Sequence, residues 1–384
     1  MSDSGQDRTV RTPPRGWSPR TDLAADRGPS DPGPDAVDRR AAIDARSLAL
    51  RRALGRTVRS SAAVASRAAA LSTGYRSGAP GSPSGGYVHD RATAEAYAAA
   101  RMPATFAAIA RAMTATAERA GAFAPTTLLD VGAGTGAAAW AATAAFPSLR
   151  ALTLVDREPA TVELGRRLAH QPPADPVLGA AEWRTAALDG SADLPRADLV
   201  TATYLLGELG DDAGATGVER LWAATNGILL LVEPGSRAGF ERIRAARASL
   251  IAAGGHVVAP CPPDAPCPIA GAVWCHFLAR LDRSPLQRGA KAATRSWEDE
   301  PFSYVAIART PPVEAAPAPR VVLGRPRQRP GVIELRICVD GQIERRTLSR
   351  RDGPAWRTAR DLAWGDAVPA EVLDAGRGER DQAR

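Results

Sequence analysis

Short apolar runs alternate with amphipathic segments through the middle of the chain, which predicts strands alternating with helices. Six runs have the length and apolar content of buried strands, and they lie at residues 127–131, 151–155, 198–203, 228–232, 257–258 and 302–308. Segments with helical periodicity separate them at residues 137–145, 159–168, 217–225 and 239–253. This order is typical of a doubly wound α/β fold with a mostly parallel sheet.

The N-terminal third precedes this sheet and has a different pattern. Residues 1–40 are rich in Pro, Gly, Ser, Asp and Arg without a hydrophobic period, so they predict a disordered tail. Residues 41–120 are rich in Ala, Leu and Arg and predict a helical region, broken by Gly, Ser and Pro near residues 77–86. Asp90 is expected to cap one helix and Pro103 to begin the next.

After a Pro-rich linker at residues 311–319, the pattern predicts a small basic β-rich unit over residues 318–366. Its strands are expected at residues 321–323, 332–339 and 343–348, with a hairpin turn at Asp340-Gly341. Residues 320–351 carry nine arginines and three acidic residues. Residues 373–384 are expected to form a second disordered tail.

The length and composition exclude several classes of protein. A chain of 384 residues with 45% hydrophobic and 24% charged residues is too long for a small stapled module and too apolar for wholesale disorder. No window approaches the roughly 20 apolar residues of a membrane span. The first thirty residues lack the apolar core of a secretory signal, and we therefore predict a cytoplasmic protein without a membrane partner.

The net charge is +7, and Lys291 is the only lysine among 49 basic residues. Arginine suits phosphate because its planar fork donates two hydrogen bonds at once, so the charge favours a nucleic-acid partner. A codon bias toward GC explains the excess of arginine equally well. The charge alone therefore does not establish the partner.

A glycine-rich loop follows the first predicted strand and opens the next helix. It reads Asp130-Val131-Gly132-Ala133-Gly134-Thr135-Gly136, and Asp156 follows the second strand. The spacing differs from the G-x-G-x-x-G of dinucleotide sites, and Asp130 would repel a diphosphate and attract a cation. D-x-G-x-G-x-G is typical of methyltransferases that bind S-adenosylmethionine, with Asp156 placed to accept from the ribose hydroxyls. A merely structural glycine turn is the alternative.

Other polar residues are expected around the same pocket. Asp189 stands where such folds place an acid near the adenine amine, although an ordinary loop aspartate is the alternative. Tyr204 and Glu208 follow the strand that faces the transferable methyl group, and Glu233 ends the next strand. These three are the catalytic candidates. Neither an N-P-P-Y motif nor a catalytic cysteine stands there, so methyl transfer itself is not assigned.

Four cysteines occur in the chain, and three of them lie in a Cys-rich insertion at residues 260–276. They are Cys261, Cys267, Cys275 and Cys338. In a reducing compartment this grouping favours metal ligands over disulfides. Spacings of five and seven residues differ from the C-x₂-C of common zinc ribbons and favour an iron–sulfur cluster, with an unusual zinc site or four unrelated buried cysteines as alternatives.

Several segments together resemble one protein family. They are the stretch 96–105, the loop 130–136, Leu231-Val232-Glu233-Pro234-Gly235, the C-P-x₄-C-P and W-C-H-F cysteine segments, and Trp297-Glu298-Asp299-Glu300-Pro301-Phe302-Ser303-Tyr304-Val305. Over roughly residues 60–350 the chain resembles the ribosomal small subunit Rsm twenty-two family, which comprises methyltransferase-like proteins of bacteria and mitochondria.

The resemblance implies a Rossmann-like class I methyltransferase domain over residues 121–310, flanked by the N-terminal helices and the C-terminal β-rich unit. It also implies a [4Fe-4S] cluster held by the four cysteines, and the small ribosomal subunit and its rRNA as partners of a protein that is otherwise monomeric. The expected activity is S-adenosylmethionine-dependent rRNA methylation; the alternative is a non-catalytic assembly factor that uses the fold as a scaffold. The candidate RNA-binding residues are Arg280, Arg283, Arg288, Lys291, Arg295, Arg325, Arg327, Arg329, Arg345 and Arg346.

Overall fold

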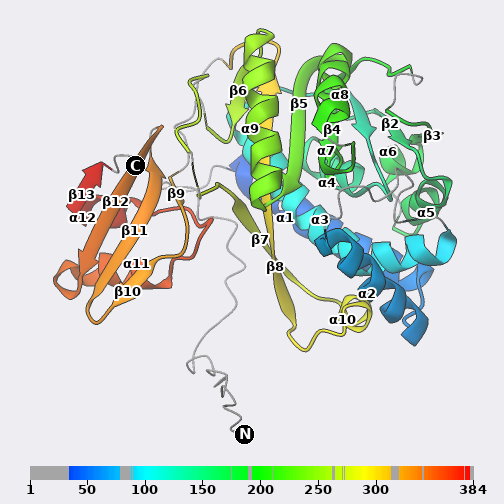
Figure 1. Ribbon diagram of the computed structural model, residues 1–384. Helices are drawn as coiled ribbons and strands as arrows, with labels where there is room; N and C mark the ends of the chain where they lie inside the picture. Colours follow the sequence, from blue (N-terminus) through cyan, green and yellow to red (C-terminus); the bar gives the residue numbers. More distant parts are fainter. Residues whose placement is uncertain are drawn as a thin grey trace, which may run out of the picture.

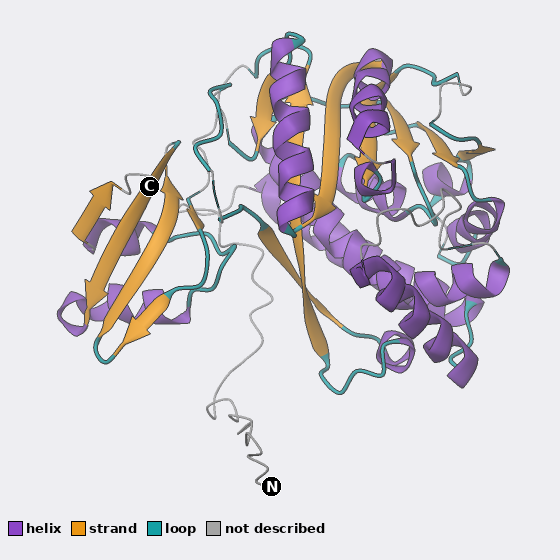
Figure 2. Cartoon of the chain, in the orientation of Figure 1, coloured by secondary structure: helices purple, strands orange, loops and turns teal. Residues whose placement is uncertain are grey.

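The computed structural model describes residues 34–77, 88, 90–173, 175–188, 193–209, 211–261, 264–269, 271, 273–312, 320–339, 341–375 and 377–380. The chain folds into a large α/β unit and a smaller β-rich unit beside it (Figure 1). Helices cover both faces of the large sheet, whereas the small sheet carries its helices on one side (Figure 2). No helix of the described part of the chain has the length and apolar character needed to cross a bilayer.

The large sheet has the strand order β3-β2-β1-β4-β5-β8-β6, with β7 paired to β8. Its strands are β1 (Thr127–Val131), β2 (Ala151–Asp156), β3 (Glu182–Thr185), β4 (Ala197–Thr203), β5 (Thr225–Pro234), β6 (His256–Ala259), β7 (Phe277–Asp282) and β8 (Trp297–Ala308). The first five strands in this order are parallel to their neighbours, and β8 is antiparallel to β5 and β6. This order, with one antiparallel strand inserted, is the class I methyltransferase sheet and confirms the predicted fold class.

Residues of the parallel strands alternate between two cores because successive side chains of a strand point to opposite faces. Leu230 and Val232 of β5 join one cluster, and Leu229 and Leu231 join the other. The first cluster packs under α1 (Pro34–Thr57), α3 (Arg91–Arg119), α4 (Ala137–Ala145) and α5 (Pro159–Ala169). The second packs under α8 (Asp211–Ala224) and α9 (Arg237–Ala252). Two short helices, α6 (Pro176–Gly179) and α7 (Leu206–Leu209), occupy loops of this unit.

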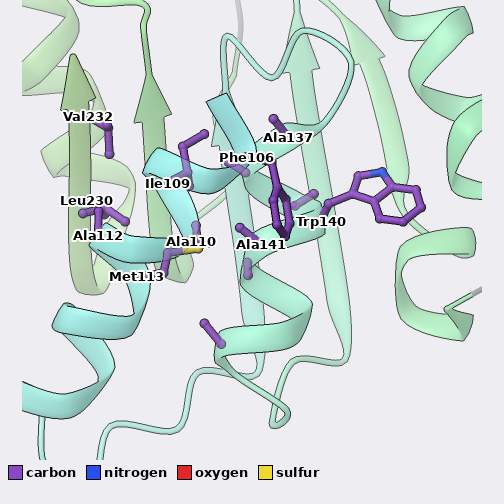
Figure 3. Packing of buried hydrophobic residues seen from close by; sticks show 14 of the residues in the cluster. Phe106, Ile109, Ala110, Ala112, Met113, Ala137, Trp140, Ala141, Leu230 and Val232 are labelled. Carbon is purple, nitrogen blue, oxygen red and sulfur yellow. The ribbon is translucent and has the colours of Figure 1, made fainter. Parts of the chain in front are cut away.

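Alanines allow helix α3 to approach the sheet closely. Phe106, Ile109 and Met113 of α3 belong to the same core cluster as Trp140 of α4 and Leu230 of β5, and Figure 3 shows α3 lying between these two elements with the Trp140 ring directed away from it. The small residues between these large ones let the helix surfaces interlock with few voids. The packing fixes α3 across the face of the sheet that also supports the glycine loop.

The N-terminal helices differ from the prediction in two ways. Helix α1 begins at Pro34, so the tail predicted to reach residue 40 was too long; Arg39 on this helix donates to the carbonyl of Ala145. Residues 1–33 lie outside the described residues. Asp90 caps α3 as expected, but α3 continues through Pro103. Burial of the helix on both sides of the proline compensates the backbone hydrogen bond that proline cannot donate.

The strand predictions missed β3 and β7 and began β8 five residues late. Helix α2 (Ala62–Ser77) packs on α3, and α10 (Pro285–Ala290) lies in the loop between β7 and β8. Strand β7 and the first half of β8 carry polar residues at many positions, so the uninterrupted apolar run that marks a central strand begins only at Tyr304.

The C-terminal unit is an antiparallel sheet in the order β10-β11-β12-β13, with β9 paired to β11. Its strands are β9 (Val321–Val322), β10 (Arg327–Arg329), β11 (Val332–Val339), β12 (Gln342–Ser349) and β13 (Arg377–Arg380), and its helices are η1 (Arg350–Asp352), α11 (Gly353–Asp361) and α12 (Ala370–Ala375). The predicted hairpin is present, with Val339 opposite Gln342; Asp340 lies outside the described residues.

The tail predicted from residue 373 was wrong for most of its length. Leu373 is buried in the core of the unit, and β13 pairs with β12. Of the linker predicted at residues 311–319, residues 313–319 lie outside the described residues.

Candidate functional site

A cavity of about 100 Å³ lies at the carboxyl ends of β1, β2 and β4. Ligands of open α/β sheets bind at this edge, where the strand order reverses. The wall includes Gly132 and Gly134 of the glycine loop, Asp156 at the end of β2, and Tyr204 after β4. Helix α3 adds Tyr97 to the same wall.

The glycine loop adopts a backbone that other residues rarely tolerate. Gly132 and Gly136 have φ angles of 71° and 88°, in the left-handed region. A Cβ at Gly132 would lie 2.8 Å from the Leu205 side chain, and one at Gly136 would lie 2.9 Å from Trp183. The glycines therefore permit both the turn and the close packing around it.

Asp156 fixes the loop from the neighbouring strand. One carboxylate oxygen accepts a 2.7 Å hydrogen bond from the Gly134 backbone N–H. The other accepts from the Glu158 N–H at 2.9 Å and from the Thr161 hydroxyl at 3.0 Å. The carboxylate faces the cavity, where a further donor such as a sugar hydroxyl can reach it.

Not all predicted cofactor residues reach the cavity. Gly132, Gly134 and Asp156 line it, whereas Ala133 and Gly136 shape the loop behind it. Asp130 is fully buried and does not line this cavity, so the expected attraction between its carboxylate and a cationic cofactor stays a prediction.

The Asp130 carboxyl has a structural role instead. Its Oδ1 accepts a 2.7 Å hydrogen bond from the Thr201 hydroxyl of β4, and its Oδ2 has no hydrogen-bond partner among the described residues. Burial raises the pKa of Asp130 to about 7. This carboxyl ties β1 to β4 directly beneath the loop.

Asp189 lies outside the described residues, so its predicted contact with adenine stays a prediction. The neighbouring Ala187 and Leu188 line the cavity. Sequence reasoning missed Tyr97 and Thr203. Thr203 ends a predicted strand on the functional edge and could have been found from that position, whereas Tyr97 depends on how α3 packs, which no local pattern reveals.

Tyr204, which lines the cavity, is paired with the buried Glu300. The Tyr204 hydroxyl donates to Glu300 at 3.3 Å, and Arg101 of α3 holds Glu300 with two hydrogen bonds of 2.7 and 3.2 Å. Burial and the Glu300 charge raise the pKa of Tyr204 well above its usual range. Tyr204 also has φ of 58°, a strained backbone for a residue with a bulky side chain. The phenol is therefore held in place as a neutral donor.

Glu233 does not line the cavity and acts on the loop after β4. It is 1% exposed, and its Oε1 accepts a 3.0 Å hydrogen bond from the Leu206 N–H at the start of α7. Arg242 lies 3.6 Å from its other oxygen. Burial raises the pKa of Glu233 to about 7, against the opposing effect of Arg242. A role in positioning α7 fits this geometry better than proton transfer at the cavity.

Glu208 does line the cavity, and its carboxylate lies 3.8 Å from Arg157 on the opposite wall. Arg157 also contacts Glu158 at 3.4 Å. This charged pair joins the end of β2 to α7. Of the three catalytic candidates, Tyr204 and Glu208 therefore lie at the cavity and Glu233 lies behind it.

All four cysteines line a second cavity, of about 210 Å³, between the two units. Cys261, Cys267 and Cys275 come from the segment between β6 and β7, and Cys338 comes from β11. Burial raises the pKa of the Cys275 thiol well above its usual range, and the three other cysteines add to the shift. The fold thus brings the distant Cys338 to the other three.

The thiols do not form a compact site for a single ion. Within the described residues, no group of three or more His, Cys, Asp or Glu side chains has an arrangement that could hold a metal ion. Ligands of a tetrahedral zinc ion lie roughly 3.8 Å apart, given Zn–S bonds of about 2.3 Å. A closed zinc site is therefore not preformed in this conformation.

Aromatic side chains join the two units beside the cysteines. The rings of Trp274 and Trp364 lie 4.2 Å apart between centroids, and the Trp364 indole donates to the Trp274 carbonyl at 3.2 Å. Trp274 itself donates to the carbonyl of Gly235, at the end of β5. His276 lies 4.9 Å from the Trp364 ring. These contacts hold the C-terminal unit against the methyltransferase-like unit.

Five of the candidate RNA-binding residues have carboxylate partners, and three of these five lie on the β7–β8 hairpin. Arg280 donates two 2.7 Å hydrogen bonds to Asp299. Arg283 and Lys291 both bind Glu298, at 2.6 and 2.7 Å. These three cations stabilise the β7–β8 hairpin, so less of their charge is available to phosphate than the sequence suggested.

The other candidates lie mainly at the surface. Arg288 and Arg295 are exposed on the connection between β7 and β8. On the C-terminal unit, Arg346 is half-buried and pairs with Glu344 at 2.8 Å. The remaining candidates on that unit are exposed and are Arg325, Arg327, Arg329 and Arg345. Their contact with RNA stays a prediction.

The sequence model of one family, described as mitochondrial small ribosomal subunit Rsm22, matches residues 91–369. This chain belongs to that family. The match includes the glycine loop, the four cysteines and most of the C-terminal unit, and it confirms the resemblance found in the sequence. The human ribosome assembly protein METTL17, mitochondrial, is 34% identical over 293 residues, which are 71% of this chain and 62% of the human protein.

A second relative is the Rsm22-cox11 tandem protein 2, mitochondrial, of Schizosaccharomyces pombe. It is 27% identical over 292 residues, which are 64% of this chain and 38% of that protein. The chain thus spans less than two thirds of the length of these curated relatives.

Solved structures resemble the chain at low sequence identity. Magnesium protoporphyrin IX methyltransferase from Synechocystis, with bound SAM, is 11% identical with a TM-score of 0.36, over 54% of this chain and 82% of that chain. Ribosomal protein L11 methylase from Lactobacillus delbrueckii subsp. bulgaricus is 13% identical with a TM-score of 0.31, over 50% of this chain and 77% of that chain.

Proposed function

We propose that this protein binds S-adenosylmethionine and rRNA and acts in the assembly of the small ribosomal subunit. The observation that carries the cofactor is the cavity at the switch point of the sheet, where the glycine loop meets Asp156. A carboxylate at this position accepts hydrogen bonds from ribose hydroxyls, and the glycines of the loop, which lack Cβ atoms, let a ligand approach the backbone. The family and the name of its human relative support the ribosomal partner.

The polar groups near the cavity favour an assembly role over catalysis. Tyr204 is engaged by Glu300, and Glu233 is engaged by the backbone of α7. Methyl transfer requires alignment of a nucleophile with the sulfonium methyl group, and water must be excluded. Of the carboxylates that line the cavity, Glu158 and Glu208 both lie beside Arg157, and Asp156 accepts hydrogen bonds from the glycine loop and α5. Methylation of rRNA is the second candidate, and the intact glycine loop favours it.

The four cysteines are proposed to hold a [4Fe-4S] cluster, with zinc as the alternative. Four thiolates suit either centre, and the cysteine donors converge on one cavity. Such a centre would join the segment between β6 and β7 to β11 and so link the two units.

The rRNA is proposed to lie along the exposed arginines of the β7–β8 connection and the C-terminal unit. Each phosphate that an arginine neutralises releases counterions, so binding is expected to weaken steeply with salt. A protein that acts on a ribosome is located in the same compartment as that ribosome. The two curated relatives are mitochondrial by name, and the cytoplasmic location expected from this sequence stays a prediction.

Calorimetry on the purified full chain tests cofactor binding. We expect S-adenosylmethionine to bind the wild type and to bind an Asp156→Ala variant at least tenfold more weakly, because the ribose loses a charged acceptor. Glu163→Ala is the matched control, since it removes an exposed carboxylate from the same region without reaching the cavity. No binding to the wild type would contradict the proposal.

Rescue of a deletion strain separates the two candidate functions. If assembly needs the fold alone, a stably folded Asp156→Ala variant restores small-subunit levels. If methylation is the function, the variant fails, and radiolabelled methyl groups enter small-subunit rRNA only with the wild type. Metal and sulfide analysis of protein purified without oxygen tests the centre: a brown protein that loses its absorption band in Cys267→Ser supports the cluster, and a colourless protein with stoichiometric zinc contradicts it.

A further inference from the structure

Helix α9 presents one of its faces to the cavity that the four cysteines line. Phe240, Arg244 and Arg247 follow one another at the spacing of neighbouring helical turns, and all three line the cavity. Figure 1 shows α9 on the side of the large unit that faces the C-terminal unit, from which Cys338 reaches the same cavity. The helix therefore supplies a wall for the cysteine site.

Most of the remaining wall is apolar. Its apolar residues include Ile243, Pro260, Pro266, Pro268, Phe277 and Val321. Among the described residues that line the cavity, the cysteines aside, Arg244 and Arg247 are the only ones that can carry charge at neutral pH. Arginine stays protonated in proteins, so this apolar cavity has two fixed positive charges on its wall.

Both arginines are attached to the segment that carries the cysteines. Arg244 donates a 2.9 Å hydrogen bond to the carbonyl of Ile269, and Arg247 donates a 3.4 Å hydrogen bond to the carbonyl of Cys261. These carbonyls lie at the two ends of the stretch that contains Cys261 and Cys267. Arg244 also pairs with Glu241 at 2.5 Å, but both side chains are nearly 40% exposed and Glu241 does not line the cavity. Water therefore screens that pair, and the guanidinium charge still acts on the cavity.

A loaded cysteine site would place negative charge in these surroundings. Four thiolates exceed the double positive charge of either a zinc ion or an oxidised [4Fe-4S] core, so both centres keep two net negative charges. Charge in an apolar environment is costly unless an opposite charge lies nearby. The two guanidinium groups match this excess in sign and in number.

We propose that Arg244 and Arg247 are positioning residues of the cysteine centre, which tie the segment with Cys261 and Cys267 to α9 and offset the negative charge of the loaded site. This inference rests on the proposed centre at the four cysteines. It assigns the arginine face of α9 to the centre and not to RNA.

Metal release and redox titration of the full chain, purified without oxygen, test these roles. We expect Arg244→Gln and Arg247→Gln each to release iron or zinc to EDTA about tenfold faster than the wild type. If the centre is a cluster, the same variants should be reduced at a lower potential, because reduction adds a negative charge that the missing arginine no longer offsets. Arg244→Lys and Arg247→Lys keep the charge and should stay close to the wild type in both measurements.

Arg237→Gln is the matched control, because it removes an exposed arginine from the same helix without reaching the cavity. It should leave both measurements unchanged. If the glutamine variants have the circular dichroism of the wild type and match Arg237→Gln in metal release and potential, the inference is wrong and the cysteine centre stands. Lysine variants that behave like the glutamine variants would also refute the offset of charge. If the wild type holds neither iron with sulfide nor zinc, the proposed centre is itself wrong, and the inference fails with it.

Discussion

Replacing Glu298 by glutamine should test whether Arg283 and Lys291 serve the fold or the RNA. The Glu298 carboxylate is 8% exposed and accepts five hydrogen bonds. Two come from Arg283, two from Lys291 and one from the Gln287 amide. Glutamine has the same shape but no charge, and it places an amide donor where one of the cations now donates.

The loss of stability follows from how little water reaches the two cations. Removing one partner of a buried ion pair costs about 3–5 kcal/mol because the remaining charge is uncompensated. The side chains of Arg283 and Lys291 keep 15% and 20% of their exposure, so partial hydration reduces the expected loss in the free energy of unfolding to about 2–4 kcal/mol. Desolvation already lowers the pKa of Lys291, in agreement with a costly burial.

Urea unfolding at pH 7 measures this loss, with Asp299→Asn as the control. Asp299 binds Arg280 on the outer face, where both side chains are about 30% exposed, so the control should lose less than about 1 kcal/mol. Equal losses in the two variants would refute the reasoning. A folded Glu298→Gln protein that gained RNA affinity without losing stability would also refute it, because Arg283 and Lys291 would then be free for phosphate.

Three further predictions concern stability. The pKa values of Asp130 and Glu233 are raised in the fold, so the folded state keeps protons that the unfolded state loses above pH 4 to 4.5. Stability should therefore fall as pH rises toward 7. Asp130→Asn and Glu233→Gln should make that fall smaller in thermal melts at pH 5 to 8. Gly239→Ala should lower the free energy of unfolding by more than about 2 kcal/mol, because its Cβ would lie 2.0 Å from a backbone oxygen. Gly55→Ala lies in open space within α1 and should raise the free energy of unfolding by about 0.5 kcal/mol. Similar free energies for the two variants in urea unfolding would contradict this prediction. Trp364→Ala should separate the calorimetric transition into two, because it removes the stacked pair between the units, and an unchanged single peak would count against that role.

The sequence was sufficient for the central sheet because its strands are buried on both faces. Strand β5 contains an uninterrupted apolar run from Ile228 to Val232, so its position is visible without knowledge of its neighbours. The glycine loop and Asp156 were found for a different reason, which is that their spacing along the sequence is itself the signal. The hairpin strand β7 was missed because its alternating Arg280 and Asp282 resemble an exposed loop.

Long-range contacts account for the remaining errors. The spacing of Asp130 from the glycines suggested a cavity residue, but the hydrogen bond from Thr201 on another strand turns its carboxyl inward. The charge of Arg283 suggested a phosphate contact, but Glu298 lies across the hairpin from it. The position of Cys338 was not an error: the grouping of all four cysteines was expected from the sequence and the family resemblance, and the packing of the two units brings them to one cavity.

The position of β8 has a consequence for how the chain folds during synthesis. Strand β8 lies between β5 and β6, and β6 pairs with no other strand of the described sheet. When the ribosome has made residues up to 259, β5 still has an open edge and β6 has no partner. The sheet can be completed only after about fifty more residues have been made. This delay raises the contact order and prolongs the exposure of the aggregation-prone edge of β5. Nascent chains that stall before residue 297 should therefore depend on chaperones far more than chains released after residue 308.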